Sequence, residues 1–178
     1  MNRVVTGYDD SGRPAILRQG EPPVVIHAGR YTTTELWVSD RGPLQPTAAD
    51  ASTREWALEP PPGGACFRIV EIAPAAAEAV LTETVLTETV PAEAGAEDAG
   101  HLDAGHLDAG HDEFQDAHAT DTLDYVTILR GVVTLVVGDA EVTLGPGDSV
   151  VQQPGVPHDW QNRGDEPAVM VGVLISAR

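Results

Sequence analysis

The segment His118-Ala-Thr-Asp-Thr-Leu-Asp124-Tyr-Val-Thr-Ile-Leu129 is the most informative part of this chain of 178 residues. Its second half is apolar and β-branched, and a glycine, Gly131, follows shortly after it. Further short apolar runs, separated by Gly, Pro and Asp, continue from there to Asn162. Apolar runs of this length, separated by turn-forming residues, predict short antiparallel strands that form a sandwich or barrel.

Two sets of polar side chains are expected to face the inside of that barrel. Because side chains alternate along a strand, Asp124 shares a face with Val126, and His158 shares a face with Trp160 and Asn162. If both faces point inward, a carboxylate and an imidazole meet in an otherwise apolar cavity. Burying such groups is costly unless a metal ion or a ligand makes use of them.

The spacing around His158 is specific. Gly147, Gly155, His158 and Asn162 follow one another with gaps of seven, two and three residues, and Gln153 stands two positions before the second glycine. This pattern resembles the second sequence motif of the cupins, a family of small β-barrels, in which a proline is usual at the position of Gln153.

A second match lies upstream. His118, Asp124 and Gly131 resemble the first cupin motif in spacing, with Thr120 at the position of the second histidine and Asp124 in place of glutamate. The resemblance extends from residue 66 to residue 176, apart from an acidic insert. The flanking pieces resemble a poorly characterised cupin subgroup that implies no particular substrate.

The resemblance implies a fold and a ligand set. The fold is an all-β, cupin-type antiparallel β-barrel or jelly-roll sandwich with N-terminal flanking strands. His118, Asp124 and His158 would hold a divalent metal ion, with Fe(II) preferred and Mn, Zn, Ni or Co as alternatives. Thr120 could hydrogen-bond a bound water or substrate. Asp121 could be a general base, or a turn residue at the start of the strand.

Three further residues are candidates for substrate binding. Trp160 favours a planar or apolar ligand, or else closes the core beside the site. Asn162 would contact the ligand, or serve only as a hydrogen-bonding residue of the barrel. Trp37 would line the mouth of the cavity, although an aromatic residue that fills the core is the more common case.

Three functions from different classes fit these residues. The preferred function is a metal-dependent enzyme with oxygenase-type chemistry on a small organic substrate, aromatic or similar to a secondary metabolite; the substrate class rests on family analogy alone. The first alternative is a non-redox metal enzyme, an isomerase, dehydratase, cyclase or decarboxylase, in which Asp121 or His118 moves a proton. The second is a small-molecule binding module without a metal. The fold does not choose among them.

Composition excludes several partners and mechanisms. The formal net charge of −18 argues against nucleic acid and anionic membranes as partners. All ten basic residues are Arg, so no lysine is present to form a Schiff base. One cysteine allows no intramolecular disulfide, which fits a cytoplasmic, reducing compartment. No apolar run approaches the ~20 residues of a membrane span.

The rest of the chain is expected to divide at residue 65. Residues 1–65 would supply a hairpin around Gly7–Gly12 and further strands at Val24–Ile26 and Glu35–Val38. Residues 66–178 would form the barrel, interrupted by a flexible acidic insert at 75–116 whose five-residue repeat suits neither a helix face nor a strand face.

Three details of this second part bear on function. The histidines of the insert, His101, His106 and His111, lack the spacing of an organised metal site. Arg68 could hold an anion in the pocket, although a solvent-facing arginine is favoured. The last strand, Ala168–Ile175, is apolar throughout, which predicts burial on both faces, and an open barrel edge favours a homodimer.

Overall fold

A computed structural model describes residues 1–40, 52, 55–75 and 117–178. Strands make up nearly all of the regular structure in this part of the chain. The all-β fold class predicted from the sequence is therefore confirmed. The acidic insert and its three histidines lie outside the described residues, apart from Ala75. Within the described ranges, no helix is long and apolar enough to cross a membrane.

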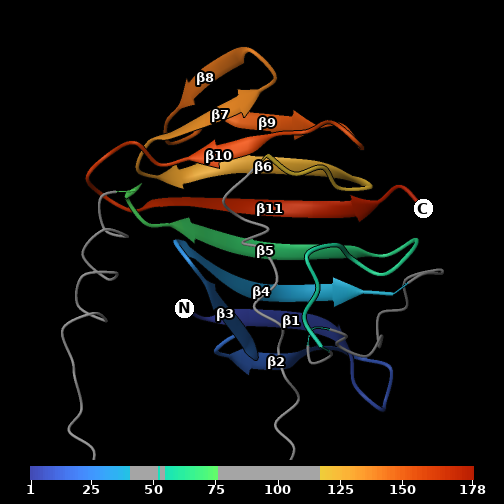
Figure 1. Ribbon diagram of the computed structural model, residues 1–178. Helices are drawn as coiled ribbons and strands as arrows, with labels where there is room; N and C mark the ends of the chain where they lie inside the picture. The colour runs from blue at the N-terminus through green and yellow to red at the C-terminus, as the bar shows by residue number, and fades with distance from the viewer. Residues whose placement is uncertain (41–51, 53–54, 76–116) are drawn as a thin grey trace, which may run out of the picture.

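The described part of the chain has eleven strands, which are arranged in three antiparallel sheets (Figure 1). A six-stranded sheet has the order β3-β4-β5-β11-β6-β9, a three-stranded sheet the order β10-β7-β8, and a hairpin pairs β1 with β2. The strands are β1 (Arg3–Tyr8), β2 (Pro14–Gly20), β3 (Val24–Ala28), β4 (Tyr31–Ser39), β5 (Ala65–Ile72), β6 (Thr122–Arg130), β7 (Val133–Val137), β8 (Ala140–Leu144), β9 (Ser149–Gln152), β10 (Asp159–Gln161) and β11 (Ala168–Ser176).

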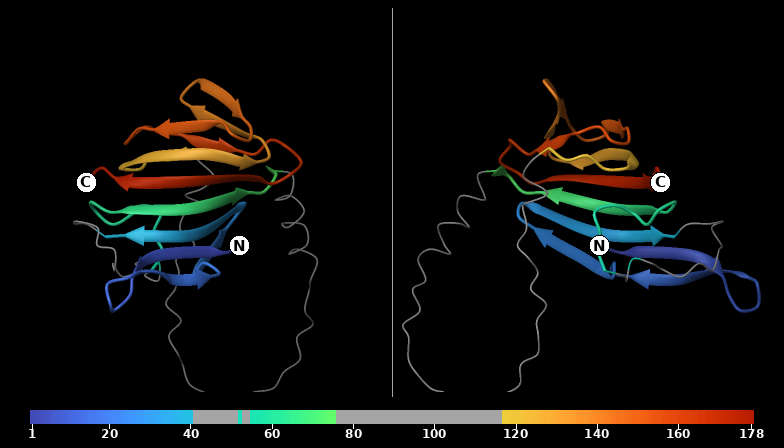
Figure 2. Two further views of the ribbon diagram at one scale, coloured as in Figure 1. Left: turned by 180° about the vertical axis from the view of Figure 1, so that it is seen from behind. Right: turned by 45° about the vertical axis from the view of Figure 1, so that its right-hand side comes forward.

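The six-stranded sheet joins distant parts of the chain. β11 lies at its centre, between β5 and β6, and is buried or half-buried along most of its length, as its apolar sequence predicts. The predicted strands near Val24–Ile26 and Glu35–Val38 are confirmed as β3 and β4. Both belong to the same sheet as the barrel strands (Figure 2). The division at residue 65 stays a prediction.

Two glycines turn the chain on either side of β7. Gly131 separates β6 from β7 with φ +72°, and Gly138 separates β7 from β8 with φ +57°. Such left-handed conformations are accessible to glycine at little cost. The turn at Gly138 joins the paired strands β7 and β8, whereas the turn at Gly131 takes the chain from the six-stranded sheet to the three-stranded sheet.

The hydrophobic core lies between the six-stranded sheet and β7, β8 and β10. Ile72 and Ile128 come from the large sheet, and Val133, Leu135 and Trp160 come from the small one. Inward positions on both sheets carry apolar side chains at every second residue, so the two inner faces pack together. The polar residues of the candidate site stand among these positions.

Candidate functional site

Two histidines are brought together by the backbone just before β6 and β10. The amide of His118 donates to the carbonyl of His158 at 3.0 Å, and the amide of His158 donates back at 2.9 Å. Their imidazole rings lie 4.6 Å apart between centroids, at an interplanar angle of 53°. Residues forty positions apart in sequence are thus fixed side by side.

The ring of His158 is oriented by its own loop. His158 is 4% exposed, and its Nδ1 lies 3.0 Å from the carbonyl oxygen of Val156. Because a carbonyl oxygen can only accept, Nδ1 must carry the proton in this contact. In the neutral ring, Nε2 is then left with a lone pair, which is the form that binds a metal ion or accepts a proton.

Asp124 projects inward from β6. It is 6% exposed, and its Oδ1 has no hydrogen-bond partner among the described residues. Burial raises the pKa of this carboxyl, while a hydrogen bond from Thr122 and the nearby His158 and Arg68 oppose the rise. A buried carboxylate oxygen without a partner is unfavourable, so the site would be stabilised by a ligand that satisfies it.

His118, Asp124 and His158 line the same small cavity, whose volume is about 80 Å³. Its remaining wall is largely apolar and comes from both sheets, with contributions from Tyr31, Val70, Val126, Met170 and Leu174. This volume admits a few water molecules or a small ligand. The cavity combines a polar end with an apolar wall, which is typical of small-molecule sites.

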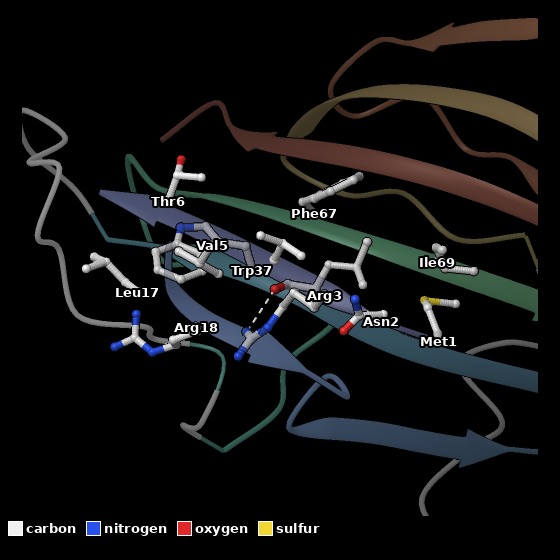
Figure 3. Close-up of a pocket in the computed structure, with 12 residues that line it drawn as sticks. Met1, Asn2, Arg3, Val5, Thr6, Leu17, Arg18, Trp37, Phe67 and Ile69 are labelled. Carbon is white, nitrogen blue, oxygen red and sulfur yellow. Dashed lines mark hydrogen bonds between the residues drawn. The ribbon is translucent and has the colours of Figure 1, made fainter. Parts of the chain in front are cut away.

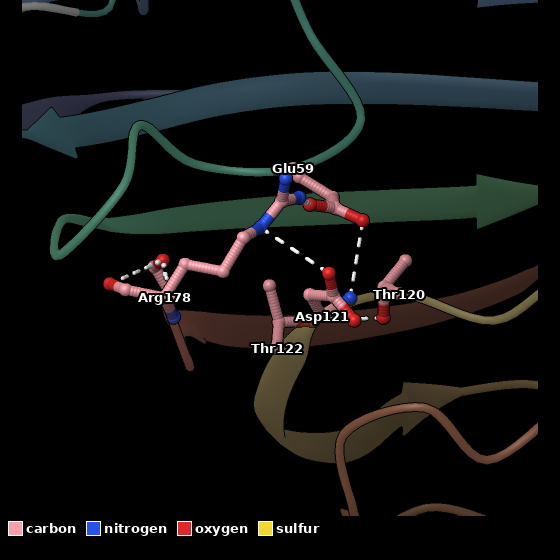
Figure 4. Close-up of polar contacts among 6 residues, drawn as sticks. Glu59, Thr120, Asp121, Thr122 and Arg178 are labelled. Carbon is pink, nitrogen blue, oxygen red and sulfur yellow. Dashed lines mark hydrogen bonds and ion pairs between the residues drawn. The ribbon is translucent and has the colours of Figure 1, made fainter.

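The structure places the two predicted catalytic residues differently (Figure 4). Thr120 is 5% exposed, lines the cavity and accepts a hydrogen bond of 2.8 Å from the Thr122 hydroxyl. Asp121 is exposed and points away, with its carboxylate 3.3 Å from Nε of Arg178. Its amide donates to Glu59, which is also paired with Arg178. The structure therefore brings Thr120, but not Asp121, to the cavity wall.

Of the three predicted substrate-binding residues, only Trp160 lines the cavity. Trp160 is 6% exposed, lines the cavity and lies edge-on to the ring of His158, with centroids 6.5 Å apart. Asn162 is fully buried, and its amide donates to the carbonyls of Ile72 and Glu166, both at 2.8 Å. Its hydrogen bonds thus tie the chain after β10 to the end of β5. Trp37 lies on the outer face of β4, away from the cavity.

Arg68 corrects a prediction from the sequence. The favoured solvent-facing position is wrong, because Arg68 is 3% exposed and forms a 2.9 Å ion pair with Glu35, which is 2% exposed. Its guanidinium also donates to the carbonyls of Leu58, at 2.9 Å, and Ala57. Arg68 and Leu58 both line the cavity.

Sequence reasoning missed Glu35 and Leu58 as neighbours of the site. One signal was available, since Arg68 alternates in phase with Cys66, Val70 and Ile72 along β5 and so shares their inward face. The partner of Arg68 could not be found in this way, because Glu35 lies 33 positions away on β4.

The side chains of His118, Asp124 and His158 are of the types that bind a divalent metal ion, but they are not close enough together to hold one. Two imidazoles and one carboxylate are ligands of Fe(II), Mn, Zn, Ni and Co, and the unpartnered Oδ1 of Asp124 could serve as one donor. No three His, Cys, Asp or Glu side chains in the described ranges are grouped closely enough to hold an ion. Metal binding would therefore require these side chains to move closer together.

Comparisons with known proteins found a matching family model and several similar solved structures. A family model described as "Cupin domain" matches residues 105–174. The cupin domain of Cnp3 from Schizosaccharomyces pombe aligns with a TM-score of 0.48 and 8% identity, over 98% of this chain and 87% of that one. A Cupin 2 conserved barrel domain protein from Salinispora arenicola CNS-205 aligns with a TM-score of 0.46 and 16% identity, over 90% and 88%.

An enzyme also aligns with the chain. The DMSP lyase DddQ from Ruegeria pomeroyi DSS-3 has a TM-score of 0.43 and 15% identity, over 83% of this chain and 47% of its own. No curated protein matches the chain. The match of the family model covers the region that carries both sequence motifs and strands β6 to β10. The comparison thus shows that residues 105–174 of this chain are similar to the cupin domain family.

Proposed function

We propose that the barrel cavity binds a divalent metal ion through His118, Asp124 and His158, and that the loaded protein is an enzyme acting on a small organic substrate. The observation that carries this proposal is the buried, unpartnered Oδ1 of Asp124 on the wall that also holds two imidazoles. A cation between these groups would offset the cost of burying the carboxylate.

The chain's own residues would bind and orient a ligand. The contact between Nδ1 of His158 and the carbonyl of Val156 fixes which ring nitrogen faces the reacting groups. The buried hydroxyl of Thr120 can hydrogen-bond a small ligand, and the edge of Trp160 limits its thickness. The apolar wall excludes water from the reacting end of the ligand, which strengthens polar contacts there.

The ligand set favours oxidative chemistry over non-redox chemistry. Three protein ligands, two His and one carboxylate, leave open positions on the ion, as in non-haem Fe(II) oxygenases. The non-redox alternatives, an isomerase, dehydratase, cyclase or decarboxylase, would use the same ion to polarise a carbonyl group. A small aromatic acid is the substrate class proposed for both.

A metal-free binding site is the second candidate function. It is favoured by the separation of the three side chains, which do not converge on one point in the structure. In that case the unpartnered oxygen of Asp124 would accept a hydrogen bond from the ligand itself.

Titration calorimetry and elemental analysis distinguish the two candidates. The protein is stripped with a chelator and titrated with Fe(II) under anaerobic conditions, and with Mn(II), Co(II), Ni(II) and Zn(II). Because the histidines of the insert could bind metal weakly, all titrations use a background in which His101, His106 and His111 are replaced by Ala. One equivalent of metal per chain is expected.

Ligand variants locate the ion. Asp124→Asn and His158→Ala should each weaken binding at least about 100-fold, since even the loss of an outer-shell partner typically costs 10–100-fold. His27→Ala is the matched control, because this exposed histidine hydrogen-bonds Thr32 and does not line the cavity. Absence of uptake in the background protein would contradict the metal proposal and leave the metal-free site.

Oxygen consumption then separates the two kinds of chemistry. Small aromatic carboxylic acids added to the Fe(II)-loaded protein should increase oxygen uptake if the enzyme is oxidative. Product formed at the same rate without oxygen would instead indicate an isomerase or lyase.

A further inference from the structure

The central cavity that holds His118 and His158 is closed at one point by a loop. Of the described residues that line it, only Leu58 lies outside the strands and the short segments that lead into β6 and β10. Leu58 belongs to loop 55–62, which precedes β5 and has no helix or strand. A ligand that entered at this point would have to displace the side chain of Leu58.

Loop 55–62 is attached to the barrel through side chains. Within the described ranges, its only backbone hydrogen bond joins the carbonyl of Pro61 to the amide of Gly64, inside the loop's own turn. Three consecutive prolines, residues 60–62, have no amide hydrogen to donate. Two sets of side-chain contacts therefore determine whether the loop stays closed.

The inner contacts are buried and come from Arg68. Its guanidinium donates to the carbonyls of Leu58, at 2.9 Å, and Ala57, and lies 5.7 Å from the ring centre of Trp56. Arg68 also pairs with Glu35 on β4, which is no part of the loop. If the loop moved away, this buried charge would keep its partner, so opening would avoid the cost of an uncompensated charge.

The outer contacts form a charged cluster at the surface (Figure 4). Glu59 accepts a hydrogen bond of 3.1 Å from the amide of Asp121 and pairs with Arg178, whose Nε lies 3.3 Å from the Asp121 carboxylate. The barrel side of this cluster is fixed, because the amide of Ala177 donates to the carbonyl of Asp121 at 2.8 Å. Glu59 is thus the residue that fastens the loop, one position after Leu58.

The outer cluster is the weaker attachment. The side chains of Arg178 and Asp121 are 55% and 58% exposed, and exposed ion pairs contribute little to stability. We propose that loop 55–62 is a gate of the central cavity, through which ligands enter. Its latch consists of Glu59, Asp121 and Arg178. The gate serves any ligand of the cavity and does not depend on a bound metal ion.

The native cysteine reports opening of the gate in the wild-type chain. Cys66 is 1% exposed and lines a second cavity, of about 290 Å³, together with Trp56 and Pro61 of the loop. Methyl methanethiosulfonate, a small neutral reagent, should label Cys66 at a rate nearly independent of urea at low concentrations, because opening a loop exposes little surface. A rate that increases with urea as steeply as global unfolding would overturn the gate.

Latch variants should open the gate more often. Glu59→Gln and Arg178→Met should each increase the labelling rate of Cys66 about threefold or more, the size expected for an exposed ion pair. Glu141→Gln is the matched control, because it breaks the exposed pair with Arg163 on the three-stranded sheet and should leave the rate unchanged. Unchanged rates in both latch variants, or an equal increase in the control, would overturn the assignment of the latch.

A thiol inside the central cavity tests the entry route itself. Met170 is 7% exposed and lines this cavity, so the thiol introduced by Met170→Cys in a Cys66→Ala background should also react about threefold faster when Glu59→Gln is added. Ile69→Cys is the control, because Ile69 lines a separate groove beneath the N-terminal hairpin (Figure 3) and should react at a rate that the latch does not affect. Faster labelling of Cys66 without faster labelling at position 170 would overturn the entry route.

Discussion

Buried polar residues in this barrel differ in how the cost of their burial is offset. Arg68 and Glu35 form a close ion pair, and the guanidinium also holds two backbone carbonyls. Asn162 is satisfied by two carbonyls and an amide. Oδ1 of Asp124 has no hydrogen-bond partner among the described residues, and Asp124 lines the cavity that also holds His118 and His158. This difference separates the scaffold residues from the proposed ligand-binding residue.

The thiol of Cys66 gives a test of burial at a single residue. Burial, with the nearby Glu35 and Asp124, raises its pKa from 9.0 to about 12, while Arg68 opposes the rise. Above pH 9 the unfolded chain releases this proton and the folded chain retains it, so the free energy of unfolding should fall as pH rises towards 12. The slope should reach about 1.4 kcal/mol per pH unit.

Urea denaturation at several pH values above 9 measures this slope. The Cys66→Ala variant is the control, because it lacks the ionising group and should lose stability more slowly over the same pH range. Parallel curves for the two proteins would show that the folded thiol ionises at its ordinary pKa.

At the scale of elements, glycines determine where strands end and hairpins turn. Both Gly131 and Gly138 have positive φ, but their surroundings differ. A Cβ at Gly131 would lie 2.6 Å from the carbonyl oxygen of Pro167 and 2.8 Å from Cα of Ala168, whereas a Cβ at Gly138 would meet nothing within 4 Å. The turn at Gly131 therefore requires glycine for two reasons, the positive φ and the lack of space for a Cβ atom.

Alanine substitutions separate these two reasons. Gly138→Ala should cost only the left-handed conformation, about 1–2 kcal/mol. Gly131→Ala should cost that amount and a further 1–3 kcal/mol or so for overpacking, because the backbone of residues 167 and 168 must shift. Urea midpoints of both variants measure the difference. Equal destabilisation would mean that the β6–β7 turn relaxes without cost.

The strands could be predicted wherever local signals were sufficient. The N-terminal hairpin, β4 and β11 follow from apolar runs bounded by turn residues, and the structure confirms them. The orientation of Arg68 was predicted wrongly, because a polar residue on an inward face is tolerated only if a distant strand supplies a partner. That partner, Glu35, is recognisable only after β4 and β5 are paired.

At the scale of the whole molecule, electrostatic self-repulsion is the dominant charge effect. The net charge of −18 acts throughout the chain, whereas exposed ion pairs such as Arg163–Glu141 contribute little. Raising NaCl from about 0.01 M to about 0.15 M shortens the Debye length from ~30 Å to ~8 Å. The melting temperature should therefore rise by a few degrees.

Scanning calorimetry across this range of salt measures the effect, and KCl should give the same shift if screening is responsible. A melting temperature that falls with salt would show that attractive pairs outweigh the repulsion.

The sequence by itself determined the strand pattern and the spacing of the motifs that propose His118, Asp124 and His158 as donor residues, because alternation and turn chemistry are local properties. It proposed Asp121 and Trp37 as site residues together with Thr120 and Trp160, while it favoured a turn role for Asp121 and a core role for Trp37. Only the tertiary structure separated them, since cross-strand register and loop contacts decide which side of a strand faces the cavity.

The apolar row on the outer face of the six-stranded sheet is likewise a tertiary property. Its members, Trp37, Phe67, Val173, Tyr125 and Val151, come from five strands, so no segment of sequence contains the pattern. Hydrogen bonding between strands brings these side chains into line, and the folded sheet alone reveals the row.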